Sequence, residues 1–404
     1  MKLIQGGVCA SKGFSASGIH CGIRKSRTKR DLGLIYSEVP ATAAAVYTQN
    51  LVKGAPLYVT KEHLKDGYAQ AVICNSGNAN TCNANGIEIA NEMAKELSKS
   101  LNVKENDVVV ASTGVIGLPL SIEPIAKGIP DLVAQLAKDG NNNASEAIMT
   151  TDTRSKQVAV EFEIDGKVCH LGGMAKGSGM IHPNMATMLV FITSDVNISS
   201  SMLQKALKSD IQDTFNMLSI DGDTSTNDMV VVMANGLANN EEIVKDDDNF
   251  KLFMKALNTV TVQLCREIAG DGEGATKLLE CKVYNAYNIP TAKIVAKSVI
   301  CSALLKAAMF GADANWGRVL CAIGYSGASV DINKIDVSFK SKKGEISVCK
   351  NGAGVEFDED IAKQILLENE IEIIVDLNDG DAFSTAWGCD LTYDYVKING
   401  DYRT

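Results

Sequence analysis

The residues from Gly172 to Thr187 form the segment of this sequence best suited to carry out chemistry. The segment reads GGMAKGSGMIHPNMAT and is followed at once by the apolar run 188–191. If the chain is cut between Ala186 and Thr187, Thr187 acquires a free α-amino group beside its own hydroxyl. That amine has an ordinary pKa of about 7.7–8 and can act as a general base. Because a hydroxyl becomes a useful nucleophile once a base lies within hydrogen-bonding reach, one residue can supply both groups.

Other uses of a glycine-rich loop do not fit the spacing. The segment lacks the GxxxxGK[ST] pattern of a phosphate loop, and no strand–GxGxxG–helix unit surrounds it, as a nicotinamide-binding fingerprint requires. A structural role for Thr187 stays open, because a threonine that begins a buried strand can have its hydroxyl satisfied inside the protein. The spacing alone does not decide between these two interpretations.

Hydrophobic patterns predict the strands and helices that would position this segment. Residues 157–164 alternate between apolar and polar, and Asp165-Gly166 is a hairpin signal before a second strand at 168–171. The runs 188–193 and 229–233 are largely apolar, which is typical of strands covered on both faces. Further strands are predicted at 335–339, 346–349 and 371–377, and helices at 86–101, 249–268, 292–310 and 360–367.

The mixture of strands and helices predicts an α/β (α+β) protein with a layered core. We assign residues 1–280 to a layered α/β catalytic core and residues 281–404 to a smaller C-terminal α/β domain. No linker or low-complexity tract marks the boundary between them.

The composition excludes several classes of protein. The chain has 404 residues, of which 46% are hydrophobic and 22% charged, values within the globular range. Its 39 Lys and Arg against 49 Asp and Glu give a formal charge of −10, which disfavours nucleic-acid binding. One basic cluster lies at residues 24–30, without aromatic residues, and we interpret it as a solvated loop.

Cysteine and histidine spacing predicts no metal site. The eleven cysteines show no CxxC pattern and the four histidines do not cluster, so we expect reduced thiols in the cytoplasm. The N-terminal residues lack the apolar stretch of a signal peptide, and the apolar stretch at 299–310 is too short to span a membrane. We therefore predict a cytoplasmic protein with no metal and no membrane partner.

Motifs along the whole chain resemble those of the ornithine acetyltransferase family, arginine-biosynthesis bifunctional proteins with an N-terminal-nucleophile mechanism. The resemblance includes the 172–187 segment and runs in order from end to end. The other motifs are NSGNAN at 75–80, ASTGVIG at 111–117, MTTDT at 149–153, DGDTSTND at 221–228, GEGATK at 272–277, GADANWGR at 311–318 and YVKINGDYRT at 395–404.

The resemblance implies an αββα-type core and self-cleavage between Ala186 and Thr187, which gives an alpha chain 1–186 and a beta chain 187–404. It assigns Thr187 as the nucleophile, with its α-amine as the base. It assigns Thr113 and Gly114 to the oxyanion hole, where a hydroxyl and a backbone N–H are the donors that acyl transfer requires. The implied substrate-binding residues are Thr153, Lys176, Thr187, Glu273, Asn399 and Thr404.

The implied reaction is ping-pong transfer of an acetyl group from N2-acetylornithine to L-glutamate through acetyl-Thr187, in cyclic arginine biosynthesis. No cofactor is implied; acetyl-CoA as a co-substrate would add N-acetylglutamate synthesis. The expected assembly is an α2β2 heterotetramer. An N-terminal-nucleophile aminopeptidase or amidase, with water as the acceptor, stays open as the alternative, and so does an uncleaved, non-catalytic binding protein.

Overall fold

The predicted hairpin before the candidate segment is present. β6 (Lys156–Ile164) and β7 (Lys167–Lys176) pair antiparallel along their whole length. The turn residues Asp165 and Gly166 have φ angles of 51° and 70°, the left-handed values that a tight hairpin turn needs.

The strand β7 is longer than the sequence indicated. Residues 172–176, which we expected to be part of a loop, belong to this strand. The glycines there serve close packing: a Cβ on Gly172 would lie 1.9 Å from the carbonyl oxygen of Gly7, and one on Gly173 would touch Leu264 of α6 (Asp248–Ala269). The expectation was wrong because glycine marks close approach of the backbone as well as turns.

The computed structural model describes residues 1–182 and 188–400, and its strands form two sheets. In the described residues the first sheet contains β1 (Lys2–Ile4), β2 (Phe14–Ile19), β3 (Leu32–Tyr47), β4 (Tyr68–Asn75), β5 (Val108–Ser112), β6, β7, β8 (Leu189–Ser194) and β10 (Met229–Ala234). The second contains β9 (Leu218–Ser219), β11 (Leu278–Ala286), β12 (Asp336–Ser341), β13 (Gly344–Lys350), β14 (Ala353–Gly354), β15 (Glu370–Asp376) and β16 (Ala382–Cys389).

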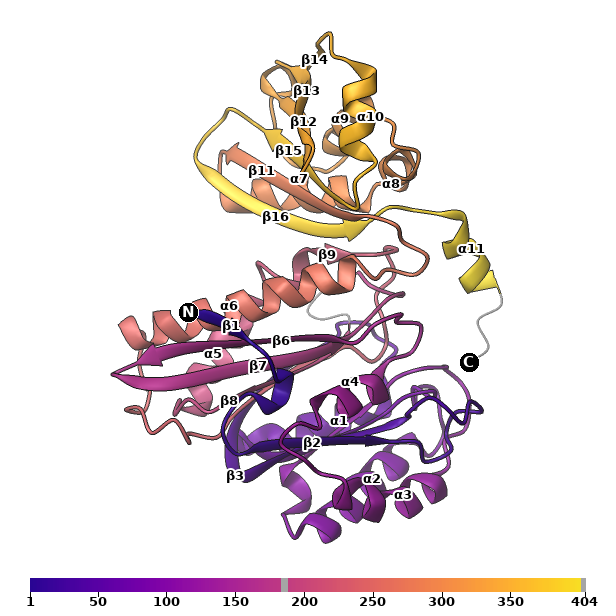
Figure 1. Ribbon diagram of the computed structural model, residues 1–404, viewed down its shortest axis with the longest axis vertical. Helices are drawn as coiled ribbons and strands as arrows, with labels where there is room; N and C mark the ends of the chain where they lie inside the picture. Colours follow the sequence, from indigo (N-terminus) through magenta and orange to yellow (C-terminus); the bar gives the residue numbers. More distant parts are fainter. Residues whose placement is uncertain (183–187, 401–404) are drawn as a thin grey trace.

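Helices cover both sheets (Figure 1). The other α-helices of the described chain are α1 (Ala55–His63), α2 (Gly86–Leu101), α3 (Ile122–Ala134), α4 (Asn141–Ile148), α5 (Ser200–Asp210), α7 (Ile289–Cys301), α8 (Ala303–Phe310), α9 (Trp316–Gly324), α10 (Glu359–Leu366) and α11 (Tyr393–Gly400). Short 3₁₀ turns are η1 (Gly7–Cys9), η2 (Leu64–Asp66), η3 (Glu105–Asp107), η4 (Phe215–Met217) and η5 (Ile332–Lys334).

The first sheet folds into two layers that face each other. Its strand order is β1-β6-β7-β8-β10-β3-β4-β5, with β2 paired to β3. The sixteen-residue strand β3 joins the layers, since residues 42–47 pair with β10 whereas residues 32–37 pair with β2. α6 packs against β6 and β7, and α2 and α3 cover the opposite layer (Figure 1). The result is the four-layer αββα arrangement that we expected.

Alternation of side chains along the strands explains these layers. In β8, Val190 and Ile192 join a core beneath α6, whereas Leu189 and Phe191 point into a second core shared with β4 and β5. Since successive residues of a strand face opposite sides, apolar residues at every position require cover on both faces. The continuous apolar runs in the sequence therefore predicted β8 and β10 correctly.

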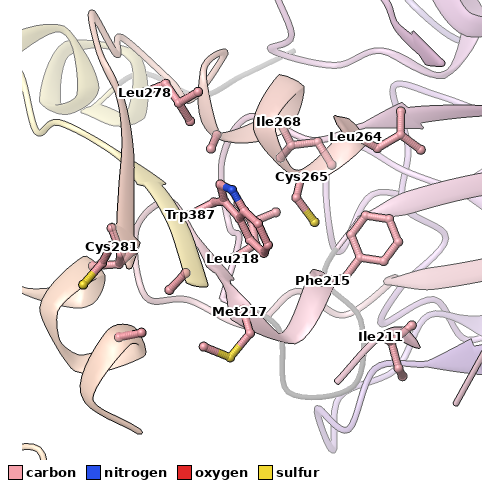
Figure 2. Close-up of a cluster of buried hydrophobic side chains, with 14 of the residues drawn as sticks. Ile211, Phe215, Met217, Leu218, Leu264, Cys265, Ile268, Leu278, Cys281 and Trp387 are labelled. Carbon is pink, nitrogen blue, oxygen red and sulfur yellow. The ribbon is translucent and has the colours of Figure 1, made fainter. Parts of the chain in front are cut away.

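The two sheets share one core. β9, the edge strand of the second sheet, contacts α6 and pairs with Trp387 and Gly388 of β16. Figure 2 shows Trp387 beside Leu218 and Ile268, and its indole N–H donates to Glu280 at 2.9 Å. Apart from β9, the strands of the second sheet begin with β11 at Leu278, near the predicted limit at residue 280. The domain boundary itself stays a prediction.

One predicted helix is divided in two. Residues 292–310 contain most of α7 and all of α8, which are separated at Ser302. The hydroxyl of Ser302 accepts a hydrogen bond from the N–H of Leu305 and so caps α8. The apolar pattern runs on through the break and gave no signal of it. Within residues 1–182 and 188–400, none of the helices combines the length and apolarity needed to cross a membrane.

Candidate active site

A cavity of about 300 Å³, which we call the active-site pocket, lies where the two layers of the first sheet meet α11. Its walls come from parts of the chain far apart in sequence: residues 79, 113–116, 150–151, 176, 179–180, 225–227, 273 and 399. Six of the sequence motifs contribute to it, in addition to the 172–187 segment. The volume suits a small metabolite.

The end of β5 places two hydrogen-bond donors in this pocket. Asn75 accepts the N–H of Thr113 at its carbonyl and the hydroxyl of Ser112 at its side chain, which fixes the turn after β5. Gly114 has a φ of 131°, and a Cβ there would lie 2.4 Å from the backbone of Gly77. In the described residues nothing accepts a hydrogen bond from the hydroxyl of Thr113 or the N–H of Gly114. Both donors are therefore available to a ligand oxygen.

Lys176, at the end of β7, is the buried cation of the pocket. It pairs in the sheet with Leu189, the second residue after Thr187. Its side chain is only 8% exposed, and among the described residues its ammonium group has no hydrogen-bond or ion-pair partner. A buried ammonium without a partner is costly, so an anionic ligand at this position would be strongly favoured.

A buried ion network lies beside Lys176 and holds the pocket wall. The ammonium of Lys156 lies 2.6 Å from a carboxylate oxygen of Asp152 and 2.5 Å from one of Asp271. Asp152 also accepts the N–H of Gly177 at 2.7 Å and that of Thr150 at 2.9 Å. Burial alone would raise the pKa of Asp152, but the nearby lysine ammonium groups outweigh it and lower that pKa to about 2. The network ties together the three segments that carry residues 150, 177 and 271.

Glu273 supplies a carboxylate on the other side of the pocket. Its backbone N–H donates to Ser178 at 2.8 Å, and its side chain accepts a hydrogen bond of 2.7 Å from the amide of Asn399. Gly179 lies flat against this carboxylate, since a Cβ there would come within 2.3 Å of it. Lys176 and Glu273 form no ion pair with each other, so the pocket offers separate sites for an anion and a cation.

Two residues at the pocket have roles that sequence reasoning missed. The side chain of Asn227 donates to the carbonyls of Ala79 and Ser112 and so fixes the pocket wall. Asp228 is buried, and one of its carboxyl oxygens has no partner in the described residues. Burial raises the pKa of Asp228 well above its usual range, which favours the neutral form of this carboxyl. The sequence identified 221–228 only as a polar turn.

The structure brings together Thr113, Gly114, Lys176, Glu273 and Asn399 of the predicted site. Thr153 instead lines an adjoining cavity, and its hydroxyl donates to Asp271. Three predicted residues, Ala186, Thr187 and Thr404, lie outside the described residues. Their assigned roles stay predictions.

Comparison with known proteins gives consistent matches over the whole chain. Residues 15–404 match the model of the ArgJ family. The arginine biosynthesis bifunctional protein ArgJ of Caldanaerobacter subterraneus subsp. tengcongensis is 52% identical over 405 residues, which covers 100% of both chains. ArgJ 1 of Clostridium acetobutylicum is 50% identical over 392 residues, 97% of this chain and 96% of that protein.

A solved structure gives a partial match. The arginine biosynthesis bifunctional protein argJ from Bacillus halodurans is 47% identical with a TM-score of 0.50. The match covers 97% of that solved chain but only 52% of this one. A polypeptide in that crystal thus corresponds to about half of the present sequence.

Proposed function

The chain belongs to the ArgJ family, and from this premise we propose that it transfers an acetyl group from N2-acetylornithine to L-glutamate. The products are ornithine and N-acetylglutamate. The relatives that match the full length of the chain are named as bifunctional proteins of arginine biosynthesis, in agreement with this proposal.

The observation that carries the proposal is a pair of hydrogen-bond donors in the active-site pocket that have no acceptor among the described residues. The hydroxyl of Thr113 and the N–H of Gly114 are fixed by the turn after β5 and have no acceptor among the described residues. Donors held in this way stabilise the negative oxygen that develops when an acetyl carbonyl is attacked.

The proposed reaction has two balanced steps. In the first, the hydroxyl oxygen of Thr187 attacks the acetyl carbon, the C–N bond to ornithine breaks, and the hydroxyl proton passes through the α-amine of Thr187 to the departing nitrogen. In the second, the neutral α-amine of glutamate attacks the ester. The C–O bond to Thr187 breaks, and the proton lost by glutamate returns to the threonine oxygen.

The two charges of the pocket fit the donor substrate. N2-acetylornithine has one carboxylate and one free ammonium, at opposite ends of a short chain. We assign the carboxylate to Lys176 and the ammonium to Glu273, which Asn399 orients. Both charges serve the donor whether glutamate or water is the acceptor, so the preference for the transferase over the hydrolase rests on the family match. Thr153 and Thr404 are part of the proposed substrate site.

Three finer points belong to the same proposal. Acetyl-CoA serves as a second acetyl donor, in line with the word bifunctional in the relatives' names. Two cleaved chains assemble as an α2β2 heterotetramer, which native mass spectrometry would detect at twice the mass of one chain. The enzyme works in the cytoplasm; each of the eleven cysteines lies in the described part of the chain and is a free thiol.

The test combines the intact mass of the denatured protein with N-terminal sequencing, in the wild type and in Thr187→Ala. We expect two wild-type fragments, one of which begins at Thr187, and one intact chain in the variant. Acetylornithine with and without glutamate then separates the activities: a transferase makes N-acetylglutamate, whereas a hydrolase releases acetate at the same rate without glutamate. An intact wild-type chain, or glutamate-independent acetate release, contradicts the proposal.

A further inference from the structure

The basic loop, residues 24–30, is fixed against the turn that carries Thr113 and Gly114. Asp31, which is fully buried, accepts the N–H groups of Cys21, Gly22 and Arg24 at 2.6, 3.3 and 2.9 Å. The carbonyl of Asp31 in turn accepts the N–H of Ser76, next to Asn75. The loop that we interpreted as solvated is therefore anchored at its base.

Beside this loop lies a second cavity of about 660 Å³, which we call the basic-loop cavity. Its walls are residues 24, 28–30, 146 and 149–155, and it shares Thr150 and Thr151 with the active-site pocket. The two cavities thus lie on either side of one short segment of backbone. The guanidinium of Arg24 donates to the carbonyl of Met149 and so connects the loop to that segment.

The charges around the basic-loop cavity are mostly positive. Its two acidic side chains are already engaged: Glu146 with Arg30 at 2.5 Å and Asp152 with the buried Lys156. By contrast, Lys29, which lines the cavity, and Lys25 and Arg27, which lie on the same loop outside the lining, have exposed side chains with no hydrogen-bond or ion-pair partner among the described residues. On a chain with a net charge of −10, three unpaired cations within five residues mark a site for an anion.

The donor acetylornithine does not need such a site, because the active-site pocket already offers a partner for its carboxylate and for its ammonium. A donor with phosphate groups would need it. We propose that the basic-loop cavity binds the phosphate-bearing nucleotide part of CoA, so that the acetyl thioester of acetyl-CoA reaches across Thr150 and Thr151 into the active-site pocket. This inference rests on the proposed second activity.

The chemistry in the pocket is the same as for acetylornithine. The hydroxyl oxygen of Thr187 attacks the thioester carbon, the C–S bond breaks, and the proton of the hydroxyl passes to the sulfur, which leaves as the CoA thiol. Glutamate then collects the acetyl group. Lys and Arg on the loop act only on the phosphates, since ammonium and guanidinium groups pair well with them.

The test measures binding of CoA, dephospho-CoA and pantetheine to the purified wild-type enzyme by isothermal titration calorimetry. The three probes differ in their phosphate groups, and we expect affinity to fall in that order. Lys25→Ala/Arg27→Ala/Lys29→Ala is expected to weaken CoA binding about tenfold or more, because each charged hydrogen bond lost costs about one order of magnitude in Kd. Pantetheine binding should stay unchanged.

A matched control removes three positive charges from another part of the surface. Lys53, Lys61 and Lys208 line a separate cavity of about 450 Å³ that shares no lining residue with the active-site pocket. The triple alanine variant of these lysines should bind CoA as the wild type does. Equal affinity for CoA and pantetheine, or loss of CoA binding in the control but not in the loop variant, overturns the proposal.

Activity assays separate this inference from the proposed function. The loop variant should lose kcat/KM for acetyl-CoA while its kcat/KM for acetylornithine stays within about twofold, since that donor has no phosphate. Loss of both reactions to the same extent would show a structural defect and contradict a phosphate site. Failure of the wild type to transfer acetyl from acetylornithine would instead refute the proposed function.

Discussion

Two buried lysines on neighbouring strands have opposite surroundings. Lys156 of β6 is enclosed by the carboxylates of Asp152 and Asp271, whereas Lys176 of β7 has no partner among the described residues. Lys156 pairs in the sheet with Ala175, so the two lysines belong to adjacent positions of one ladder. A paired buried charge holds segments together, and an unpaired one at a pocket is available to a ligand. The presence of carboxylate partners therefore indicates a structural role for Lys156, and their absence indicates a ligand-binding role for Lys176.

The largest effect should follow from Lys156→Met. Removal of this ammonium leaves Asp152 and Asp271 buried without a counter-ion, which costs about 3–5 kcal/mol in free energy of unfolding. Urea unfolding at pH 7 measures the loss. Lys167→Met, at the exposed start of β7 beside the turn of the same hairpin, is the control and should change stability by less than about 0.5 kcal/mol.

The same network has a defined pH dependence. The pKa of Asp152 is lowered from 3.8 to about 2 in the folded state, so its contribution to stability is complete above pH 3.8 and is lost as the pH falls toward 2. The wild type should lose this contribution over that interval, and Lys156→Met should show a smaller change. An equal loss in both proteins would contradict the assignment.

Gly114→Ala should lower kcat by about 10²–10³, the usual cost of losing one oxyanion donor. The added Cβ would lie 2.4 Å from Gly77 and displace the N–H of residue 114. Gly117→Ala is a matched control, because Gly117 also has a positive φ, 78°, but open space around it. Steady-state kinetics of acetyl transfer compare the two; similar losses of kcat would attribute the effect to backbone strain.

Lys176→Met should lower kcat/KM for acetylornithine about 10- to 100-fold, because a hydrogen-bonded charge contributes about 1.5–3 kcal/mol to binding. Its free energy of unfolding should change much less than that of Lys156→Met, since Lys176 has no hydrogen-bond or ion-pair partner among the described residues. Lys176→Met is thus expected to change mainly the kinetics, whereas Lys156→Met is expected to change mainly the free energy of unfolding. A destabilised Lys176→Met protein with normal kinetics would break the comparison between the two lysines.

Asp228→Asn should give the smallest effect, a stabilisation that depends on pH. Burial raises the pKa of Asp228, so folding must protonate a group that is ionised in the unfolded chain above about pH 4. The wild type therefore loses stability as the pH rises from 4 to 7, whereas the asparagine variant does not. Thermal unfolding at both pH values tests this, and an unchanged difference between the proteins would contradict it.

The sequence predicted helices and strands better than it predicted where backbone segments pack closely against each other. The β6–β7 hairpin, α2 and α6 followed from periodicity and turn residues, which are local signals. The extension of β7 through Gly172 depended on contact with Gly7, a residue far away in the chain. The local sequence carries no signal that two backbone segments will pack closely together, so a glycine at such a contact is easily assigned to a loop.

Prediction of the site had a similar limit. Motif resemblance identified residues such as Lys176 and Glu273, which the fold brings into one pocket. It gave no role to Asp228 or to the basic loop, because a polar turn and a solvated loop explain those residues equally well from sequence. Their significance comes from burial and from the cavity beside them, which only the three-dimensional arrangement provides.

The strand order of the first sheet has a consequence for refolding. β8 and β10 follow Thr187 in the chain, yet they lie between β7 and β3, which precede it. Residues 1–186 thus form both flanks of the sheet, and the remainder of the chain forms its centre. If the chain is cut before Thr187, as we propose, the native sheet can form again only when two polypeptides meet, and recovery from denaturation should then depend on protein concentration. Under the same proposal, the lifetime of the active protein is set by how slowly it unfolds.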